Sequence, residues 1–191
     1  MKIALTFDDG PHPRYTREIL DILDDYGITA TFFVVGENVE YYPESFAMLL
    51  NSGHEIGNHT YSHPRFNNNQ PGGIQEEIGK CHALLKDKFG YEATLFRPPE
   101  GRLNESVKTA STEWDYKIIL WNVDTLDWKH TPPQQIADHV VSGVRSGDII
   151  LMHDYISYNS PTPAALRIII PRLLAHGFQF VTVSELIACQ S

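Results

Sequence analysis

The sequence predicts an α/β fold, an incomplete barrel of about seven β/α units in one domain. Short apolar runs alternate about seven times with segments of helical period, which is typical of a parallel sheet covered by helices. The chain has 191 residues without a break in composition, so a single domain over residues 1–191 is expected. A regular eight-unit barrel needs about 250 residues, so this barrel should be smaller and incomplete.

The predicted strands are short, apolar and rich in β-branched and aromatic residues. They cover residues 2–7, 30–35, 55–58, 94–97, 117–121, 148–152 and 178–183.

Amphipathic stretches between these runs predict the helices. The first, 16–26, carries Ile19, Leu20 and Leu23 at helical spacing and precedes Gly27, which suits the left-handed position after a helix. Pro43 suits the first turn of a second helix. Further helices are expected at 72–89, 104–114, 133–144 and 163–176, with a short one from Ser184.

The composition is that of an ordinary globular protein, with 42% hydrophobic and 20% charged residues. The net charge of −9 argues against a nucleic-acid partner, because such partners need lysine and arginine to neutralise phosphates. A neutral or weakly charged substrate is therefore expected. Cys81 and Cys189 fit neither a disulfide scaffold nor a paired-cysteine metal site. We also expect no membrane segment, and a monomer.

The first residues run directly into the first motif and leave no room for a signal peptide. This indicates either a cytoplasmic protein or a chain trimmed to its domain.

The chemically capable side chains follow the predicted strands at the same end. In α/β barrels this carboxyl end is where active sites are built, so we expect these groups to converge. They are Asp8 and Asp9, His59 and His63, Arg97, Asp124 and Asp127, and His153.

The segments Thr6–Pro11 and His59–Pro64 together suggest a metal hydrolase site. One aspartate can bind a cation while its neighbour moves a proton, and two histidines can offer neutral nitrogens to the same ion. A set of one carboxylate and two histidines leaves open positions on a catalytic zinc ion. The same set also describes non-haem iron oxygenases, so iron remains an alternative occupant.

Two further groups complete the expected machinery. Arg97 offers a fixed fork that can hold a carboxylate such as Asp8. His153 follows a buried strand, where it could protonate a departing amine or alkoxide.

The motifs TFDDGP, HTYSHP, RPPEG, DTLDW and LMHD resemble, in order and spacing, those of the polysaccharide deacetylases. This is the NodB-homology domain, or carbohydrate esterase family 4. The resemblance covers nearly the whole chain. It implies an irregular (β/α)7 barrel, metal-dependent removal of acetyl groups from carbohydrate, and action outside the cell or at its envelope.

The resemblance also implies a role for each matching residue. Asp9, His59 and His63 would bind a divalent metal, most simply Zn²⁺, with Co²⁺ and other ions possible. Asp8 would be the general base ordered by Arg97, and His153 the general acid tuned by Asp127. Trp128 and Leu151 would line the pocket for the acetyl methyl group.

The third motif departs from the family pattern, because Glu100 stands where an aromatic residue is usual. The backbone N–H there can still help to hold an oxyanion, but side-chain contacts with the sugar should change. We further expect Tyr155 and Tyr158 to contact substrate.

Three functions remain open at this point. The first is deacetylation of an N-acetylated carbohydrate of the peptidoglycan or chitooligosaccharide type. The second is an O-acetyl esterase acting on xylan, because the segments 53–58 and 161–163 resemble the clostridial acetylxylan esterase branch of the family. The third is an inactive carbohydrate-binding protein on the same scaffold.

Overall fold

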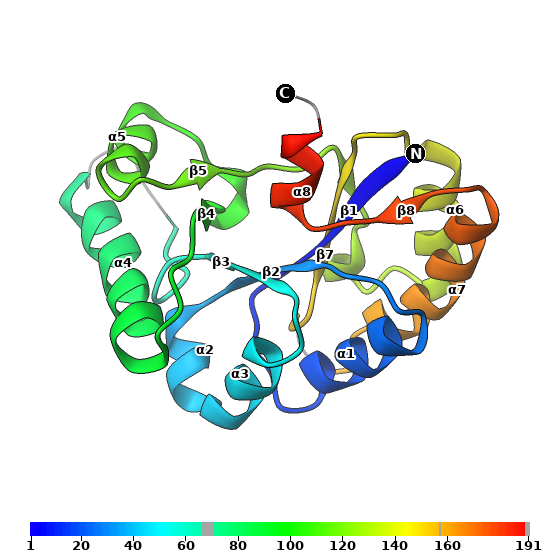
Figure 1. The fold of residues 1–191 in the computed structure, drawn as a ribbon, viewed down its shortest axis with the longest axis horizontal. Coiled ribbons are helices and arrows are strands. Elements are labelled where there is room, and N and C mark those ends of the chain that lie inside the picture. Colours follow the sequence, from blue (N-terminus) through cyan, green and yellow to red (C-terminus); the bar gives the residue numbers. More distant parts are fainter. Residues whose placement is uncertain (66–70, 157, 190–191) are drawn as a thin grey trace.

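A curved sheet of parallel strands forms the centre of the computed structural model, which describes residues 1–65, 71–156 and 158–189 (Figure 1). Seven strands follow one another in the order β5-β4-β3-β2-β1-β7-β6, and β8 pairs with the start of β1. Within the described residues no pairing joins β5 to β6, so the barrel is open there. The strands are β1 (Lys2–Asp8), β2 (Thr31–Val34), β3 (Glu55–Asn58), β4 (Leu95–Phe96), β5 (Lys117–Ile118), β6 (Val123–Asp124), β7 (Ile149–His153) and β8 (Gln179–Phe180).

The helices cover the outer face of this sheet. The first half of the chain contributes α1 (Tyr15–Asp25), α2 (Gly36–Tyr41), α3 (Pro43–Leu50) and α4 (Pro71–Ala83), which continues as the π-helical turn Leu84–Lys88. The second half contributes α5 (Glu105–Glu113), α6 (Pro133–Gly143), α7 (Thr162–Ala175) and α8 (Val183–Ala188).

The incomplete barrel predicted from the sequence is confirmed, with local differences. Helix α2 and strand β6 were not predicted, because two to six residues are too short to show a period. The strands predicted at 117–121 and 178–183 keep two residues each. The last run stops early because Thr182 leaves the sheet to form a reciprocal capping box with Glu185, so α8 begins at Val183.

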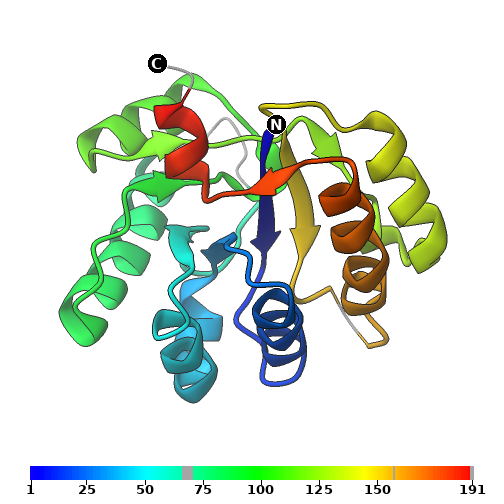
Figure 2. The same cartoon turned by 45° about the vertical axis from the view of Figure 1, so that its right-hand side comes forward.

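Strands β1 and β7 run side by side through the middle of the sheet (Figure 2). Their register places Asp8 level with His153. Since side chains alternate between the two faces of a strand, Ala4, Thr6 and Asp8 share the inner face of the barrel. The register therefore brings the catalytic candidates of β1 and β7 to the same height.

The two faces of the sheet pack into separate apolar cores. Outward-facing residues such as Leu5, Phe7 and Ile150 belong to the larger core beneath the helices. The smaller core fills the amino end of the barrel and includes Phe33, Leu95, Ile119, Val183 and Leu186. Helix α8 thus closes one end of the barrel, and the carboxyl end stays open for a site.

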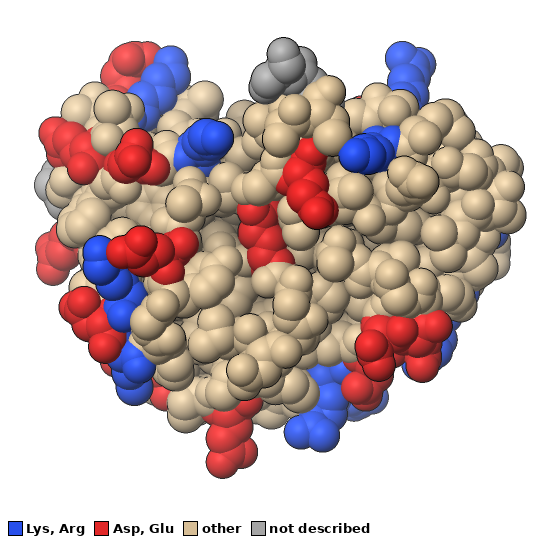
Figure 3. All heavy atoms as spheres, viewed as in Figure 1, with Lys and Arg blue, Asp and Glu red and all other residues tan. Residues whose placement is uncertain are grey.

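Charged side chains lie mostly around the edge of the face seen in Figure 3, with both signs interspersed. Among the described residues, no helix has the length and apolar character needed to cross a membrane.

Gly57 lets strand β3 pass close to Phe33 inside the barrel. A Cβ at Gly57 would lie 2.5 Å from the Phe33 ring and 3.1 Å from the Leu95 carbonyl oxygen. We expect Gly57→Ala to lower the free energy of unfolding by about 1–3 kcal/mol, the usual cost of overpacking. Urea denaturation followed by circular dichroism measures it.

Gly143 in α6 provides the matched control, because a Cβ there meets nothing within 4 Å. Gly143→Ala should be neutral, or stabilising by up to about 1 kcal/mol. Equal stability of the two variants would show that the approach to Phe33 places no constraint on residue 57.

Candidate active site

The predicted catalytic and metal-binding residues converge at the carboxyl end of the barrel. A cavity of about 470 Å³ opens there. Its lining residues come from the ends of strands and the loops that follow them: Asp8, Asp9, His59, His63, Arg65, Glu100, Trp121, Asp124, Trp128, Leu151 and His153.

Asp9, His59 and His63 form a cluster suited to a metal ion. The Asp9 Oδ1 atom lies 3.4 Å from His59 Nε2 and 3.3 Å from His63 Nε2, and the three ligand atoms lie within 4.8 Å of one another. Donors bound to one tetrahedral zinc ion stand roughly 3.3 Å apart, given bond lengths of about 2.0–2.1 Å. Asp9 Oδ1 is buried and accepts no hydrogen bond from the described residues. The donor set therefore fits a divalent cation.

Each ligand is oriented by its surroundings. The Arg97 carbonyl oxygen can only accept a hydrogen bond, so His59 Nδ1, at 2.7 Å, carries the proton and leaves the Nε2 lone pair facing Asp9. Asp9 and His63 have φ angles of 74° and 52°, in the left-handed region that few residues other than glycine adopt. Such strain commonly marks functional positions, where surrounding contacts hold the backbone in place.

The charges within the cluster also favour a cation. Burial disfavours a charged Asp9 carboxylate, but His59, His153 and His63 together outweigh the effect of burial, so the pKa of Asp9 is lowered. Burial likewise opposes a charged His59, yet Asp8 and Asp9 raise its pKa. Both shifts have the same origin, because carboxylate charge gathers around the imidazole nitrogens, and such a site favours a bound cation.

Asp8 is held by an arginine in the barrel interior. Arg97 is 0% exposed, and its Nη1 donates to Asp8 Oδ1 at 2.7 Å and to Thr6 Oγ1 at 2.8 Å. The second oxygen, Asp8 Oδ2, lies 3.6 Å from His59 Nε2. One oxygen of Asp8 is thus hydrogen-bonded to Arg97, and the other faces the cluster of Asp9, His59 and His63.

His153, which lines the cavity, forms a hydrogen-bonded pair with the buried Asp127. Asp127 Oδ1 accepts from His153 Nδ1 at 2.8 Å, and Asp127 Oδ2 accepts from the His153 backbone N–H at 2.8 Å and from Thr162 Oγ1 at 2.7 Å. Burial would lower the pKa of His153, but Asp127, Asp9 and Asp8 together raise it to about 9. The imidazole is therefore protonated at neutral pH with its Nε2–H available.

The apolar part of the cavity comes from Leu151, Trp121 and Trp128. Trp128 is 47% exposed, and its indole N–H lies 3.4 Å from Asp124 Oδ1. Glu100 lies on the rim with a φ of 55°, in the 3₁₀ turn η2 (Pro99–Gly101), and is paired with Arg65 and Arg102.

Two residues expected to contact substrate do not line this cavity. Tyr155 stacks on the His12 ring with centroids 4.6 Å apart, and Tyr158 is 91% exposed. The segment after His153 turns away from the metal cluster towards α1, because the Tyr15 hydroxyl accepts the backbone N–H groups of Asn159 and Ser160.

Sequence reasoning missed the supporting residues Thr162 and Asp154. The Asp154 carboxylate is fully buried, accepts from Thr16 Oγ1 at 2.5 Å and lies against Gly10, where a Cβ would be 2.0 Å from Oδ2. Burial raises the pKa of Asp154 to about 7. The position of Asp154 next to His153 in the LMHD motif could have suggested a role for it. However, a carboxylate at the end of a strand does not indicate which loop it will contact.

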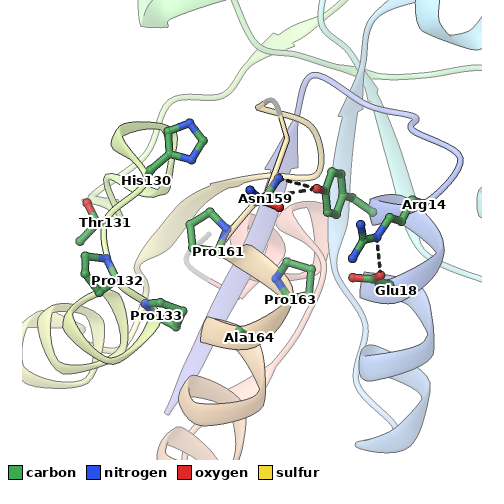
Figure 4. A pocket seen from close by; sticks show the side chains of 12 residues that line it. Arg14, Glu18, His130, Thr131, Pro132, Pro133, Asn159, Pro161, Pro163 and Ala164 are labelled. Carbon is green, nitrogen blue, oxygen red and sulfur yellow. Dashed lines mark hydrogen bonds and ion pairs between the residues drawn. The ribbon is translucent and has the colours of Figure 1, made fainter.

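A second cavity of about 470 Å³ lies between the amino ends of α1, α6 and α7 (Figure 4). Proline side chains and the ion pair of Arg14 with Glu18 surround it. None of the residues predicted for catalysis or metal binding lines it, and we assign it no role.

Similar proteins identify this arrangement. The sequence profile of the polysaccharide deacetylase family matches residues 1–119. The chain is 42% identical over 187 residues to a peptidoglycan-N-acetylglucosamine deacetylase of Bacillus cereus, covering 97% of this chain and 87% of the relative. It is 40% identical to the peptidoglycan-N-acetylmuramic acid deacetylase PdaC of Bacillus subtilis, covering 96% of this chain but only 38% of that relative.

A solved structure gives the same result. The fold matches a family 4 acetyl xylan esterase from Clostridium thermocellum in complex with a cobalt ion, with a TM-score of 0.91, 38% identity, and coverage of 99% of this chain and 91% of that one. The profile, the relatives and the fold agree with the motifs found in the sequence. The chain belongs to the polysaccharide deacetylase family, carbohydrate esterase family 4.

Proposed function

We propose that this chain is a metal-dependent deacetylase that hydrolyses the acetamido group of an N-acetylated carbohydrate and releases acetate. One observation carries the proposal. Two side chains able to move protons line the same cavity as three side chains that could hold a metal ion: Asp8, which pairs with Arg97, and His153, which pairs with Asp127. Amide hydrolysis needs these functions together, since a proton must leave water and another must reach the departing nitrogen.

Asp9, His59 and His63 would hold the divalent ion. Two imidazole nitrogens and one carboxylate oxygen suit zinc, and they also accept cobalt or iron. When bound, the ion would lower the pKa of water and polarise the acetyl carbonyl.

Asp8 would act as the general base. Arg97 donates to Oδ1, while Oδ2 faces the cluster and can take a proton from the attacking water. Because the arginine is buried, Asp8 keeps one orientation through the reaction.

His153 would act as the general acid. As water attacks the carbonyl carbon and the C–N bond breaks, Nε2–H can protonate the departing nitrogen, which leaves a free amine and acetate. Asp127 fixes the Nδ1–H tautomer and, with Thr162 bound to its second oxygen, keeps the ring in place.

Trp128 and Leu151 would enclose the acetyl methyl group, and Glu100 would face the sugar. Tyr155 and Tyr158 would contact only parts of a longer glycan outside the cavity. Two relatives are described as deacetylases of N-acetylated peptidoglycan sugars, which favours an N-acetyl over an O-acetyl substrate. We further propose a single catalytic domain that works as a monomer on envelope or extracellular glycans.

Metal removal should abolish activity reversibly. We expect acetate release from N-acetylglucosamine oligomers to be lost after dialysis against a chelator and restored by one equivalent of Zn²⁺. Binding should also raise the free energy of unfolding, by about 2.7 kcal/mol at one hundred times Kd. Acetate assays and thermal denaturation measure the two effects.

The same assays test the alternatives. Faster release from acetylated xylan than from N-acetylglucosamine oligomers would favour an O-acetyl esterase. Zinc binding without acetate release from either substrate would support an inactive binding protein.

Asp8→Asn should separate metal binding from proton transfer. We expect the variant to retain its metal content but lose about 10²- to 10⁴-fold in kcat, because the amide cannot accept the proton from water. Metal analysis and steady-state kinetics measure the two quantities.

Asp138→Asn is the control for this variant, since Asp138 is an exposed carboxylate that also pairs with an arginine, Arg172. Its kcat should match that of the wild type. Turnover of Asp8→Asn close to the wild-type value would remove Asp8 from the role of base.

Asp127→Asn should shift the pH profile. The raised pKa means that His153 is protonated below about 9 and loses its proton above it, so activity should fall on the alkaline side. Without the Asp127 charge the pKa of His153 falls, and we expect the alkaline limb of kcat/KM to move to lower pH by about one unit or more. An unchanged limb would indicate that another group supplies the proton.

A further inference from the structure

We propose that Arg65, held in place by Glu100, is a specificity residue that binds a carboxylate group of the glycan, so that the preferred substrate is an acid-bearing N-acetylated glycan. This rests on the proposed deacetylase function and adds the substrate class. The lactyl group of N-acetylmuramic acid, an ether-linked carboxylate, is an acid of this kind.

The first step of the argument is the position of Arg65. It follows the metal ligand His63 by two residues, and both side chains line the catalytic cavity. Because Arg65 is so close to His63 in the chain, its guanidinium lies within reach of a sugar whose acetyl group is beside Asp9, His59 and His63. Arginine is suited to carboxylates because its planar fork presents several N–H donors.

The second step is the way Glu100 holds this arginine. Glu100 Oε1 lies 3.2 Å from Arg65 Nε, and Glu100 Oε2 lies 2.6 Å from Arg102 Nε. Glu100 contacts the Nε atom of Arg65, and the Arg65 side chain is 82% exposed, so its two terminal nitrogens are accessible to a ligand. Glu100 thus forms ion pairs with two arginines, Arg65 and Arg102. The three side chains together carry one excess positive charge.

The third step is the rigidity of the turn that carries Glu100. Glu100 occupies a left-handed backbone position directly after the buried Pro99. At Gly101, an added Cβ would lie 2.6 Å from the Trp121 ring, so the turn packs tightly on that wall of the cavity. A fixed carboxylate reduces the side-chain entropy that Arg65 loses when it binds a ligand.

The fourth step concerns the acidic residues of the cavity, which would otherwise repel an acid. Asp8 faces Arg97, and Asp9 belongs to the cluster suited to a cation. Asp124 accepts the N–H groups of Leu126 and of the Trp128 indole. The net charge of −9 first suggested a neutral or weakly charged substrate, but the groups beside Arg65 are locally compensated.

The test uses glycans of alternating N-acetylglucosamine and N-acetylmuramic acid of one length, with lactyl carboxylates either free or blocked as methyl amides. The zinc-loaded protein should have a kcat/KM about fivefold higher for the free acid, mainly through KM, because the carboxylate lies away from the reacting bond. The ratio should fall towards one in 0.5 M NaCl, since exposed charge pairs are screened by salt.

Arg65→Gln should bring the ratio of the two substrates close to one, and Arg65→Lys should retain part of it. Glu100→Gln keeps the Arg65 side chain but removes the carboxylate that orients it, so this variant should lower the ratio. The control is Arg167→Gln, which removes another exposed arginine paired with a carboxylate, Asp25, and should keep the wild-type ratio. Because the two kcat/KM values are measured on the same protein, their ratio does not depend on the fraction of active enzyme in each preparation.

Equal rates of the wild type on free and blocked glycans would overturn this inference and leave the proposed deacetylase intact. A preference that persists in Arg65→Gln would overturn it as well. Preference for the blocked glycan, or for oligomers carrying free amino groups, would point to Glu100 as the binding group instead. Absence of acetate release from these glycans and from N-acetylglucosamine oligomers would reject the deacetylase and this inference together.

Discussion

The ion pair between Arg97 and Asp8 organises the rest of this site. A fully buried guanidinium is stable only when its charge and its N–H groups are satisfied. Arg97 donates to Asp8, to Thr6 on the same strand, and to the carbonyl oxygens of Ile119 and Leu120. Its face also lies over the Phe33 ring at 4.2 Å. A single side chain therefore links the first, second, fourth and fifth strand segments of the barrel.

The backbone of Arg97 also contacts the cluster of Asp9, His59 and His63. The Arg97 carbonyl accepts the His59 Nδ1–H, which sets the tautomer of that ligand. Asp8 and His59 are thus positioned by one residue, through the side-chain nitrogen Nη1 of Arg97 and through its backbone carbonyl oxygen. Removing the arginine side chain would leave a buried carboxylate without its partner, so its contributions to folding and to catalysis are coupled.

Much of this arrangement could be predicted from the sequence, because barrel strands place their carboxyl ends on one rim. Asp8, His59, Arg97 and His153 come from four strands or their ends, and all four face the interior as strand alternation requires. The positions of Tyr155 and Tyr158 could not be predicted in this way. They lie on a loop whose direction depends on the Tyr15 hydroxyl, a contact between residues about 145 positions apart.

The polar contacts that stabilise the loop after β1 could not be predicted from the sequence either. They explain how this loop holds Asp9 in a strained backbone conformation. Asp9 has a positive φ, yet the loop is fixed on both sides. Asn38 donates to the Asp9 carbonyl at 2.7 Å, and the Asp154 carboxylate fills the space where any side chain at Gly10 would lie. An uncommon backbone conformation persists only when several contacts determine it together. The position of Asp9 is thus set partly by Asn38, which lies outside the sequence motifs, so motif residues alone describe only part of the site.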